Sequence, residues 1–150
     1  MKNRKKVILF AGLFWMISIL CGCGREDVTE KTTQEQIIIW TWDETFNVKA
    51  AKTAATLYEE EHPELTIQVI TKEREEIQTD IKNLLSAELY EDLPDIIMLE
   101  DYDVQEMLAQ FDDEFVDLTD RMNYDKFVDY KRKLCSRNDR MYGIPFDSGT

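Results

Sequence analysis

The chain is 150 residues long and has 31 acidic against 18 basic residues, which gives a formal net charge of −13 at pH 7. Nucleic acids and anionic lipid surfaces bind basic patches, so both are poor candidates as partners of so acidic a protein. A solvated, soluble surface explains the charge equally well. The length allows one hydrophobic core rather than two.

The first 22 residues have the three parts of a secretory signal. Residues 1–6 hold four basic residues, residues 7–20 are almost wholly apolar, and Gly22 is the small residue before a cleavage point. The apolar stretch is too short for a comfortable transmembrane helix. The Leu-x-Gly-Cys sequence ending at Cys23 resembles the lipobox of bacterial lipoproteins, whereas Cys21 would follow the bulky Leu20.

We therefore expect removal of residues 1–22 and acylation of Cys23 by a lipid such as palmitate. The protein would then be anchored by lipid at the extracellular face of the cell membrane. An ordinary signal peptide with two chance cysteines is the alternative. Loss of the four basic residues would change the net charge from −13 to −17. Cys135 would then be left without a disulfide partner or zinc-ligand spacing, which predicts a small packing residue on a helix.

Residues 23–36 are polar and have no periodic apolar face. Such a segment cannot bury enough surface to offset the entropy of ordering, so it is predicted to be a flexible tether. The folded region is predicted to begin near Ile37 and to occupy residues 37–150.

Strand and helix patterns alternate at the start of the folded region. Residues 37–42 are a β-branched and aromatic run typical of a strand buried on both faces, and residues 65–70 alternate as a second strand. Between them, a helix is predicted from near residue 47 to the His62-Pro63 pair. Its buried face is predicted to consist of Val48, Ala51, Ala55 and Tyr58.

The same alternation continues toward the C-terminus. Asp103 is expected to cap the third helix through its side-chain oxygen. The predicted elements are a helix with Ile77, Ile81, Leu84, Leu85 and Glu88 ending near Asp92, a strand at 95–99, a helix with Val104, Met107, Leu108 and Phe111, a helix at 124–134, a turn at 138–140 and a strand at 141–146.

This order of elements predicts an α/β fold with a mainly parallel sheet and flanking helices, joined by right-handed crossovers. Ligands of such sheets bind beyond the carboxyl ends of the strands. Three of these ends combine an aromatic residue with carboxylates. They are Trp42-Asp43-Glu44, Glu100-Asp101-Tyr102-Asp103 and Phe146-Asp147-Ser148.

Motifs of hydrolases, nucleotide-binding proteins and zinc sites are missing from the sequence. Asp101-x-Asp103 loosely resembles the start of a calcium loop, but Glu106 stands where that loop needs glycine. We therefore expect no enzymatic activity, no cofactor and no metal. Carboxylates and aromatic rings suit sugar binding, because carboxylates accept hydrogen bonds from hydroxyls and rings cover the apolar face of a pyranose. A glycosidase that uses Glu44 or Glu100 is the catalytic alternative.

Four segments together resemble an extracellular solute-binding protein of an ABC importer, of the sugar-binding, maltose-binding-protein-like group. They are the lipobox, residues 37–43 (IIIWTWD), residues 93–98 (LPDIIM) and residues 140–149 (RMYGIPFDSG). The resemblance covers residues 37–150. It implies a type II periplasmic-binding-protein lobe, which in the family is joined by a hinge to a second lobe. A solute binds between the lobes, and the closed form docks on permease subunits.

The resemblance also implies a sugar ligand and the residues that hold it. Structural alternatives are that Trp42 covers the sheet end, that Glu100 caps a helix and that Asp147 braces the hinge. The expected ligand-binding residues are Trp42, Asp43, Glu44, Glu100, Asp101, Tyr102, Asp147 and Ser148.

Family members are usually more than twice as long as this chain, which stops about where the crossing to a second lobe would begin. We therefore expect a truncated chain without the second lobe, which alone binds solute weakly or not at all. Two other functions stay open at this point. One is the same transport machinery with a cationic cargo such as a polyamine, and the other is a surface lipoprotein without a transport role.

Overall fold

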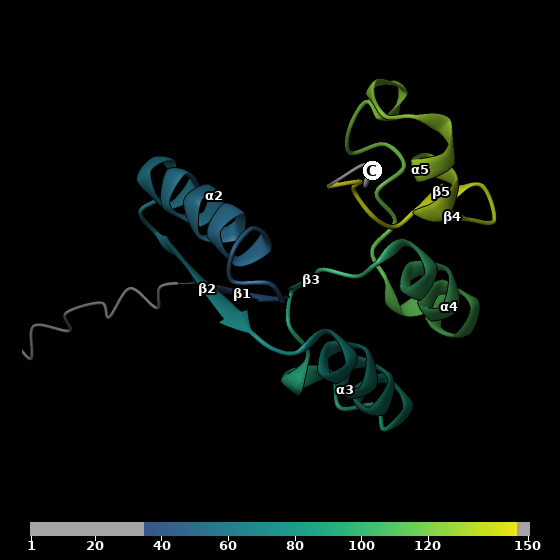
Figure 1. Cartoon of the computed structure of the whole chain (residues 1–150), viewed down its shortest axis with the longest axis horizontal. Coiled ribbons are helices and arrows are strands. Elements are labelled where there is room, and N and C mark those ends of the chain that lie inside the picture. Colours follow the sequence, from purple (N-terminus) through teal and green to yellow (C-terminus); the bar gives the residue numbers. More distant parts are fainter. Residues whose placement is uncertain (1–34, 147–150) are drawn as a thin grey trace, which may run out of the picture. The chain divides into compact units, whose positions relative to one another are not determined.

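The computed structural model describes residues 35–146. Its main sheet has three parallel strands in the order β2-β1-β3, with β1 (Glu35–Thr41) in the centre (Figure 1). β2 (Leu65–Thr71) pairs with β1 along its whole length, and β3 (Ile96–Ile97) pairs with β1 on the other side. The predicted α/β fold with a parallel sheet and flanking helices is confirmed.

Two strand boundaries differ from the predictions. β1 begins two residues before Ile37, because Glu35 and Gln36 pair with the start of β2. In addition, the side-chain amide of Gln36 donates to the side-chain oxygen of Gln68 (2.8 Å). β3 has two residues instead of the five expected over 95–99. Asp95 binds Ile38 through its own amide (2.9 Å) and through its carboxylate (2.8 Å), which replaces the regular ladder at that position.

The helices α2 (Asn47–Glu61) and α3 (Arg74–Ser86) cover opposite faces of the sheet (Figure 1). The chain steps from β1 to β2 through α2 and returns across β1 to β3 through α3, so right-handed crossovers put the two helices on opposite sides. α2 buries Val48, Ala51 and Ala55 as predicted. Tyr58 was expected on that face but is 46% exposed, because its ring stacks on His62 with centroids 4.3 Å apart.

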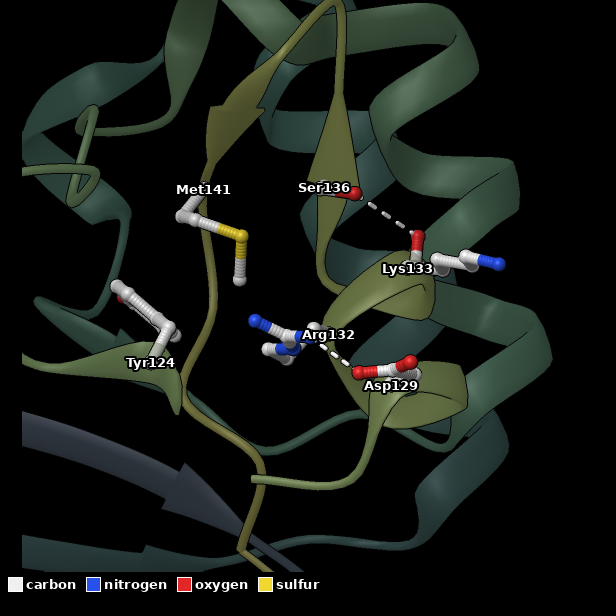
Figure 2. Close-up of a pocket in the computed structure, with 6 residues that line it drawn as sticks. All are labelled: Tyr124, Asp129, Arg132, Lys133, Ser136 and Met141. Carbon is white, nitrogen blue, oxygen red and sulfur yellow. Dashed lines mark hydrogen bonds and ion pairs between the residues drawn. The ribbon is translucent and has the colours of Figure 1, made fainter. Parts of the chain in front are cut away.

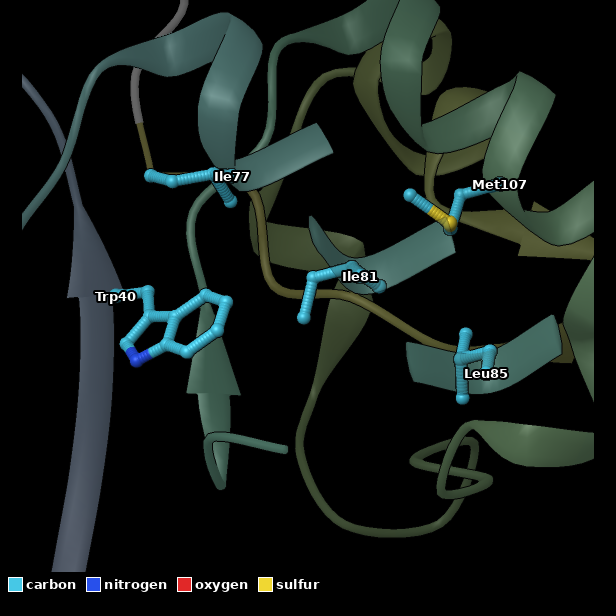
Figure 3. Close-up of a cluster of buried hydrophobic side chains, with 5 residues drawn as sticks. All are labelled: Trp40, Ile77, Ile81, Leu85 and Met107. Carbon is cyan, nitrogen blue, oxygen red and sulfur yellow. The ribbon is translucent and has the colours of Figure 1, made fainter. Parts of the chain in front are cut away.

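The main core lies between the sheet and α3 and is completed by α4 (Asp101–Phe111) (Figure 3). Side chains alternate along β1, so Ile38, Trp40 and Trp42 share the face that α3 covers. Ile77 is fully buried in this layer. The buried cluster consists of Trp40, Ile77, Ile81, Leu85 and Met107.

The end of α3 departs from the predicted helix, which included Glu88 and ran to near Asp92. Glu88 has a left-handed backbone (φ 56°), and the helix stops at Ser86. The amides of Glu88 and Leu89 donate to Leu85 and Leu84 (3.1 and 3.0 Å), which is the hydrogen-bond pattern of a Schellman cap. A 3₁₀ turn, η2 (Tyr90–Asp92), then leads to β3.

The segment after α4 contains short elements rather than the long helix expected over 124–134. Cys135 is buried just after α5, and Asn138 and Asp139 form a tight turn with positive φ values of 51° and 62°. The predicted strand over 141–146 stops early, because its partner has only two residues between α5 and the turn. The elements are η3 (Asp112–Glu114), η4 (Tyr124–Lys126), α5 (Asp129–Leu134), β4 (Ser136–Arg137) and β5 (Arg140–Met141).

The described helices are short. The longest, α2, has 15 residues. None of the helices within residues 35–146 is long and apolar enough to cross a membrane.

Substitution of Ile77 by alanine should destabilise the fold by about 2–5 kcal/mol, because it opens a cavity in the layer between α3 and the sheet. Urea unfolding followed by tryptophan fluorescence measures this free energy. The matched control is Leu57→Ala, at a helical position that is 59% exposed, which should change stability by less than about 0.5 kcal/mol. Equal effects of the two substitutions would contradict the placement of the core.

Candidate functional site

The carboxyl ends of the three parallel strands meet at one edge of the sheet, because β1 pairs in parallel with both neighbours. Residues 42–44 follow β1, residues 72–74 follow β2 and residues 100–102 follow β3. We refer to these three segments together as the carboxyl edge. The topology therefore brings together two of the three clusters that the sequence singled out, and adds a segment that it did not.

Trp42 and Asp43 shape the loop after β1. Trp42 is half-buried and packs against the core, so it covers the end of the sheet. Asp43 has a left-handed backbone (φ 58°), and its carboxylate accepts a hydrogen bond from the Thr45 amide (3.0 Å). Its carbonyl accepts from the Val48 amide (3.1 Å), which leads the chain into α2. Glu44 is exposed beside this turn.

Glu100 and Tyr102 form a network with Arg74, which is the first residue of α3 and lies close after β2. The Arg74 guanidinium lies 2.7 Å from the Glu100 carboxylate, and the same nitrogen donates to the Tyr102 hydroxyl (2.8 Å). A hydrogen bond from Tyr102 and the neighbouring Arg74 hold the pKa of Glu100 below its ordinary value. The bond to Glu100 in turn raises the pKa of Tyr102. Glu100 therefore stays a carboxylate and Tyr102 a neutral phenol at pH 7.

Asp101 is engaged in a different contact. Both of its carboxylate oxygens accept from the Lys131 ammonium (2.9 and 2.8 Å). Lys131 is buried in α5, so the pair joins the start of α4 to that helix. A ligand role of Asp101 stays a prediction, and this contact supplies a bracing role for the same side chain.

Asp103 does not cap α4, contrary to the expectation from sequence. The helix begins at Asp101, with Glu100 at the capping position and no side-chain hydrogen bond there. Asp103 lies inside the first turn, is 5% exposed and accepts from the Gln78 side chain (2.9 Å). Burial raises the pKa of its carboxyl group above the ordinary value.

An exposed aromatic pair lies next to the carboxyl edge. The rings of Phe46 and Phe146 have centroids 6.0 Å apart, and the two residues are 57% and 54% exposed. This contact brings the closing segment of the described chain beside the loop after β1. Asp147 and Ser148, the predicted ligand residues of that segment, lie outside the described residues, as does Cys23.

Sequence reasoning missed Arg74 and Phe46. Arg74 begins α3 in a charged segment, KERE, without the aromatic residue that marked the other strand ends. Phe46 directly precedes α2, between the predicted strand and the predicted helix. A signal for both was available, because every segment after a parallel strand reaches the same edge of the sheet.

Two hollows of the described surface lie away from the carboxyl edge. One of about 330 Å³ is lined by Asp117, Asp120 and Arg121. Another of about 240 Å³ is lined by Tyr124, Asp129, Arg132, Lys133, Ser136 and Met141, and in it Arg132 is ion-paired with Asp129 (Figure 2). Neither includes a residue of the carboxyl edge. Within residues 35–146, no group of three or more potential metal ligands comes together.

Comparison with known proteins gives one informative match. No protein-family model matches the chain. The chain is 35% identical over 114 residues to the lactose-binding protein of Rhizobium radiobacter. The alignment covers 76% of this chain but 27% of that protein, so the chain spans about a quarter of the length of this relative.

The α/β fold and this match agree with the resemblance found in the sequence. The chain is a homologue of part of a sugar-binding solute-binding protein, as its resemblance to that family predicted. The relative is a binding protein and not an enzyme, which agrees with the expectation that this chain does not catalyse a reaction.

Replacement of Asp103 by asparagine should stabilise the protein at pH 7 by about 0.5–1 kcal/mol, as favourable single substitutions commonly do. The pKa of Asp103 is higher in the folded than in the unfolded protein, so its charged carboxylate opposes folding above the folded-state pKa. This destabilisation is lost as the pH falls below the folded-state pKa and the carboxyl group becomes protonated. Asparagine keeps an oxygen for Gln78. The advantage of the variant should therefore shrink at pH 4 in urea unfolding. A variant less stable at pH 7 would show that the bond from Gln78 to the charged carboxylate outweighs its burial.

Proposed function

We propose that this chain is part of an exported, lipid-anchored protein that captures a sugar outside the cell and delivers it to the permease of an ABC importer. The homology to a lactose-binding protein carries this proposal. The carboxyl edge, with its mixture of carboxylates and aromatic rings, is the surface that we assign to the sugar.

Glu100 and Tyr102 are the hydrogen-bonding groups best placed for sugar hydroxyls. Glu100 remains charged and is about one-third exposed, so it can accept a hydrogen bond while it stays paired with Arg74. Tyr102 is 61% exposed. Phe46 and Phe146 offer apolar ring faces of the kind that cover a pyranose. Trp42, Asp43, Glu44, Asp101, Asp147 and Ser148 complete the proposed sugar-binding set.

The charges at the carboxyl edge favour a neutral ligand over a polyamine. Glu100 is neutralised by Arg74 and Asp101 by Lys131. A cationic ligand would have to compete with these internal cations for the same carboxylates. A neutral sugar needs only acceptor capacity, which an ion-paired carboxylate retains.

Replacement of Glu100 by alanine should weaken sugar binding by about 1.5–3 kcal/mol, the range for hydrogen bonds to charged groups. Isothermal titration of lactose and related sugars into the protein as the source cell makes it measures this loss. Glu106→Ala is the matched control, because it removes a carboxylate paired with Lys82 (2.6 Å) outside the carboxyl edge.

Affinity for a neutral sugar should also change little between low and high salt, whereas affinity for a cation should fall steeply. An unchanged dissociation constant in the Glu100 variant would remove Glu100 from the site. Binding of polyamines but of no sugar would replace the proposed cargo. If the protein binds sugar but its deletion leaves sugar uptake by the cells unchanged, the surface lipoprotein without a transport role would be favoured.

Substitution of Cys23 by serine should release the protein from the membrane fraction, because the proposed lipid anchor is lost. Fractionation of cells labelled with radioactive palmitate measures both the location of the protein and its acylation. Cys21→Ser is the matched control and should change neither. Labelled, membrane-bound protein in the Cys23 variant would overturn the assignment of the anchor.

A further inference from the structure

Arg74 occupies a distinctive position among the cations around the carboxyl edge. It begins α3, just after β2, yet one guanidinium nitrogen contacts two residues that follow β3, Glu100 at 2.7 Å and Tyr102 at 2.8 Å. Its side chain is 35% exposed, whereas that of Lys131, which neutralises Asp101, is 10% exposed. Of these two cations, Arg74 is the one that a ligand at the edge would meet.

The other side of the guanidinium is held as well. Nη2 and Nε of Arg74 contact the Glu75 carboxylate at 2.6 and 3.2 Å. The planar fork therefore points one nitrogen at Glu100 and Tyr102 while Glu75 fixes the rest. A lysine ammonium could supply the charge at this place but could not make both sets of contacts in a fixed plane.

We propose that Arg74 sets the charge selectivity of the carboxyl edge: by pairing with Glu100 it keeps this carboxylate available to neutral polyhydroxyl ligands and weakens the attraction of the edge for cations. The inference rests on the proposed function, because it takes Glu100 as a ligand-facing group. Arg74 is a specificity-determining residue in this account. It gives a physical reason for a preference for sugars over polyamines, a choice that the acidic sequence alone left open.

The physical basis is the balance of charge around a single carboxylate. A paired carboxylate still has free lone pairs, so a sugar hydroxyl can donate to Glu100 without displacing Arg74. An ammonium group approaching Glu100 would meet a fixed positive charge within a few ångströms. Removal of the Arg74 charge leaves the Glu100 carboxylate to attract cations. A unit charge about 4 Å from a ligand charge in water changes the binding constant of that ligand by about fivefold.

The test is a titration of two ligands, lactose and spermidine, into the protein as the source cell makes it, at low salt. Arg74→Gln should raise spermidine affinity about fivefold or more, and the gain should shrink at high salt. The double variant Arg74→Gln/Glu100→Gln should return spermidine affinity to the wild-type value. Arg132→Gln is the matched control, because Arg132 is 33% exposed and ion-paired with Asp125 and Asp129 on another part of the fold (Figure 2).

Arg74→Lys separates charge from geometry. Because it keeps the positive charge, it should exclude spermidine as the wild type does, while lactose affinity falls as the contacts with Tyr102 and Glu75 loosen. The reciprocal variant Glu100→Gln removes one of the two carboxylates paired with Arg74, leaves Glu75 as the other, and should gain about fivefold in affinity for an anionic sugar such as galacturonate. This variant also keeps the inference testable if Arg74→Gln does not fold.

The possible outcomes separate the two proposals. Failure of the wild type to bind any sugar would reject the proposed function, while the spermidine and galacturonate titrations would still report on Arg74. If the wild type binds sugar, two results would overturn the inference alone. One is that Arg74→Gln gains no spermidine affinity, and the other is that Arg132→Gln gains as much as Arg74→Gln. Spermidine binding by Arg74→Lys at the level of Arg74→Gln would overturn it as well.

Discussion

The position of β1 between two parallel neighbours is the constraint on which the rest of this structure depends. Full pairing with β2 and short pairing with β3 require that the chain cross the sheet in both directions, so α2 and α3 cover opposite faces. Parallel pairing also sends all three strands to one edge. Residues that are nearly 60 positions apart in sequence, such as Trp42 and Glu100, therefore follow neighbouring strands.

Charge pairing then sets the chemistry of the edge that we assign to the ligand. The sequence is strongly acidic, and its strand-end carboxylates could in principle attract a cation. In the folded chain, however, Arg74 and Lys131 neutralise Glu100 and Asp101. These pairs neutralise two of the strand-end carboxylates and leave their oxygens as hydrogen-bond acceptors. Together with the exposed rings of Phe46 and Phe146, this chemistry suits a neutral sugar better than a polyamine.

The backbone plan of this chain could be predicted because its signals are local. The apolar run at residues 37–42, the periodic face of α2 and the His62-Pro63 stop each depend on neighbouring residues, and the structure confirms the elements they predict. Where such signals end, the predictions failed. Glu88 continues the helical spacing of α3, but a Schellman cap turns the backbone there, at a residue that is not the usual glycine.

The side-chain partners at the edge could not be predicted in this way, because they depend on contacts between distant segments. Nothing in the sequence around Glu100 indicates that Arg74, at the start of α3, will pair with it. In the same way, Asp101 finds Lys131 across α4 and α5, and Asp103 turns inward to Gln78 instead of capping its helix. The sequence thus identified two of the three strand ends that come together, while the folded chain decides which of their carboxylates are engaged within the protein.

The most direct test of this account is hydrogen–deuterium exchange of the protein as the source cell makes it, measured with and without saturating lactose. The account predicts that lactose slows amide exchange in the three segments that follow β1, β2 and β3, near residues 42–47, 72–75 and 100–104. Protection confined to the hollow lined by Tyr124, Arg132 and Ser136, with unchanged exchange at the carboxyl edge, would contradict it.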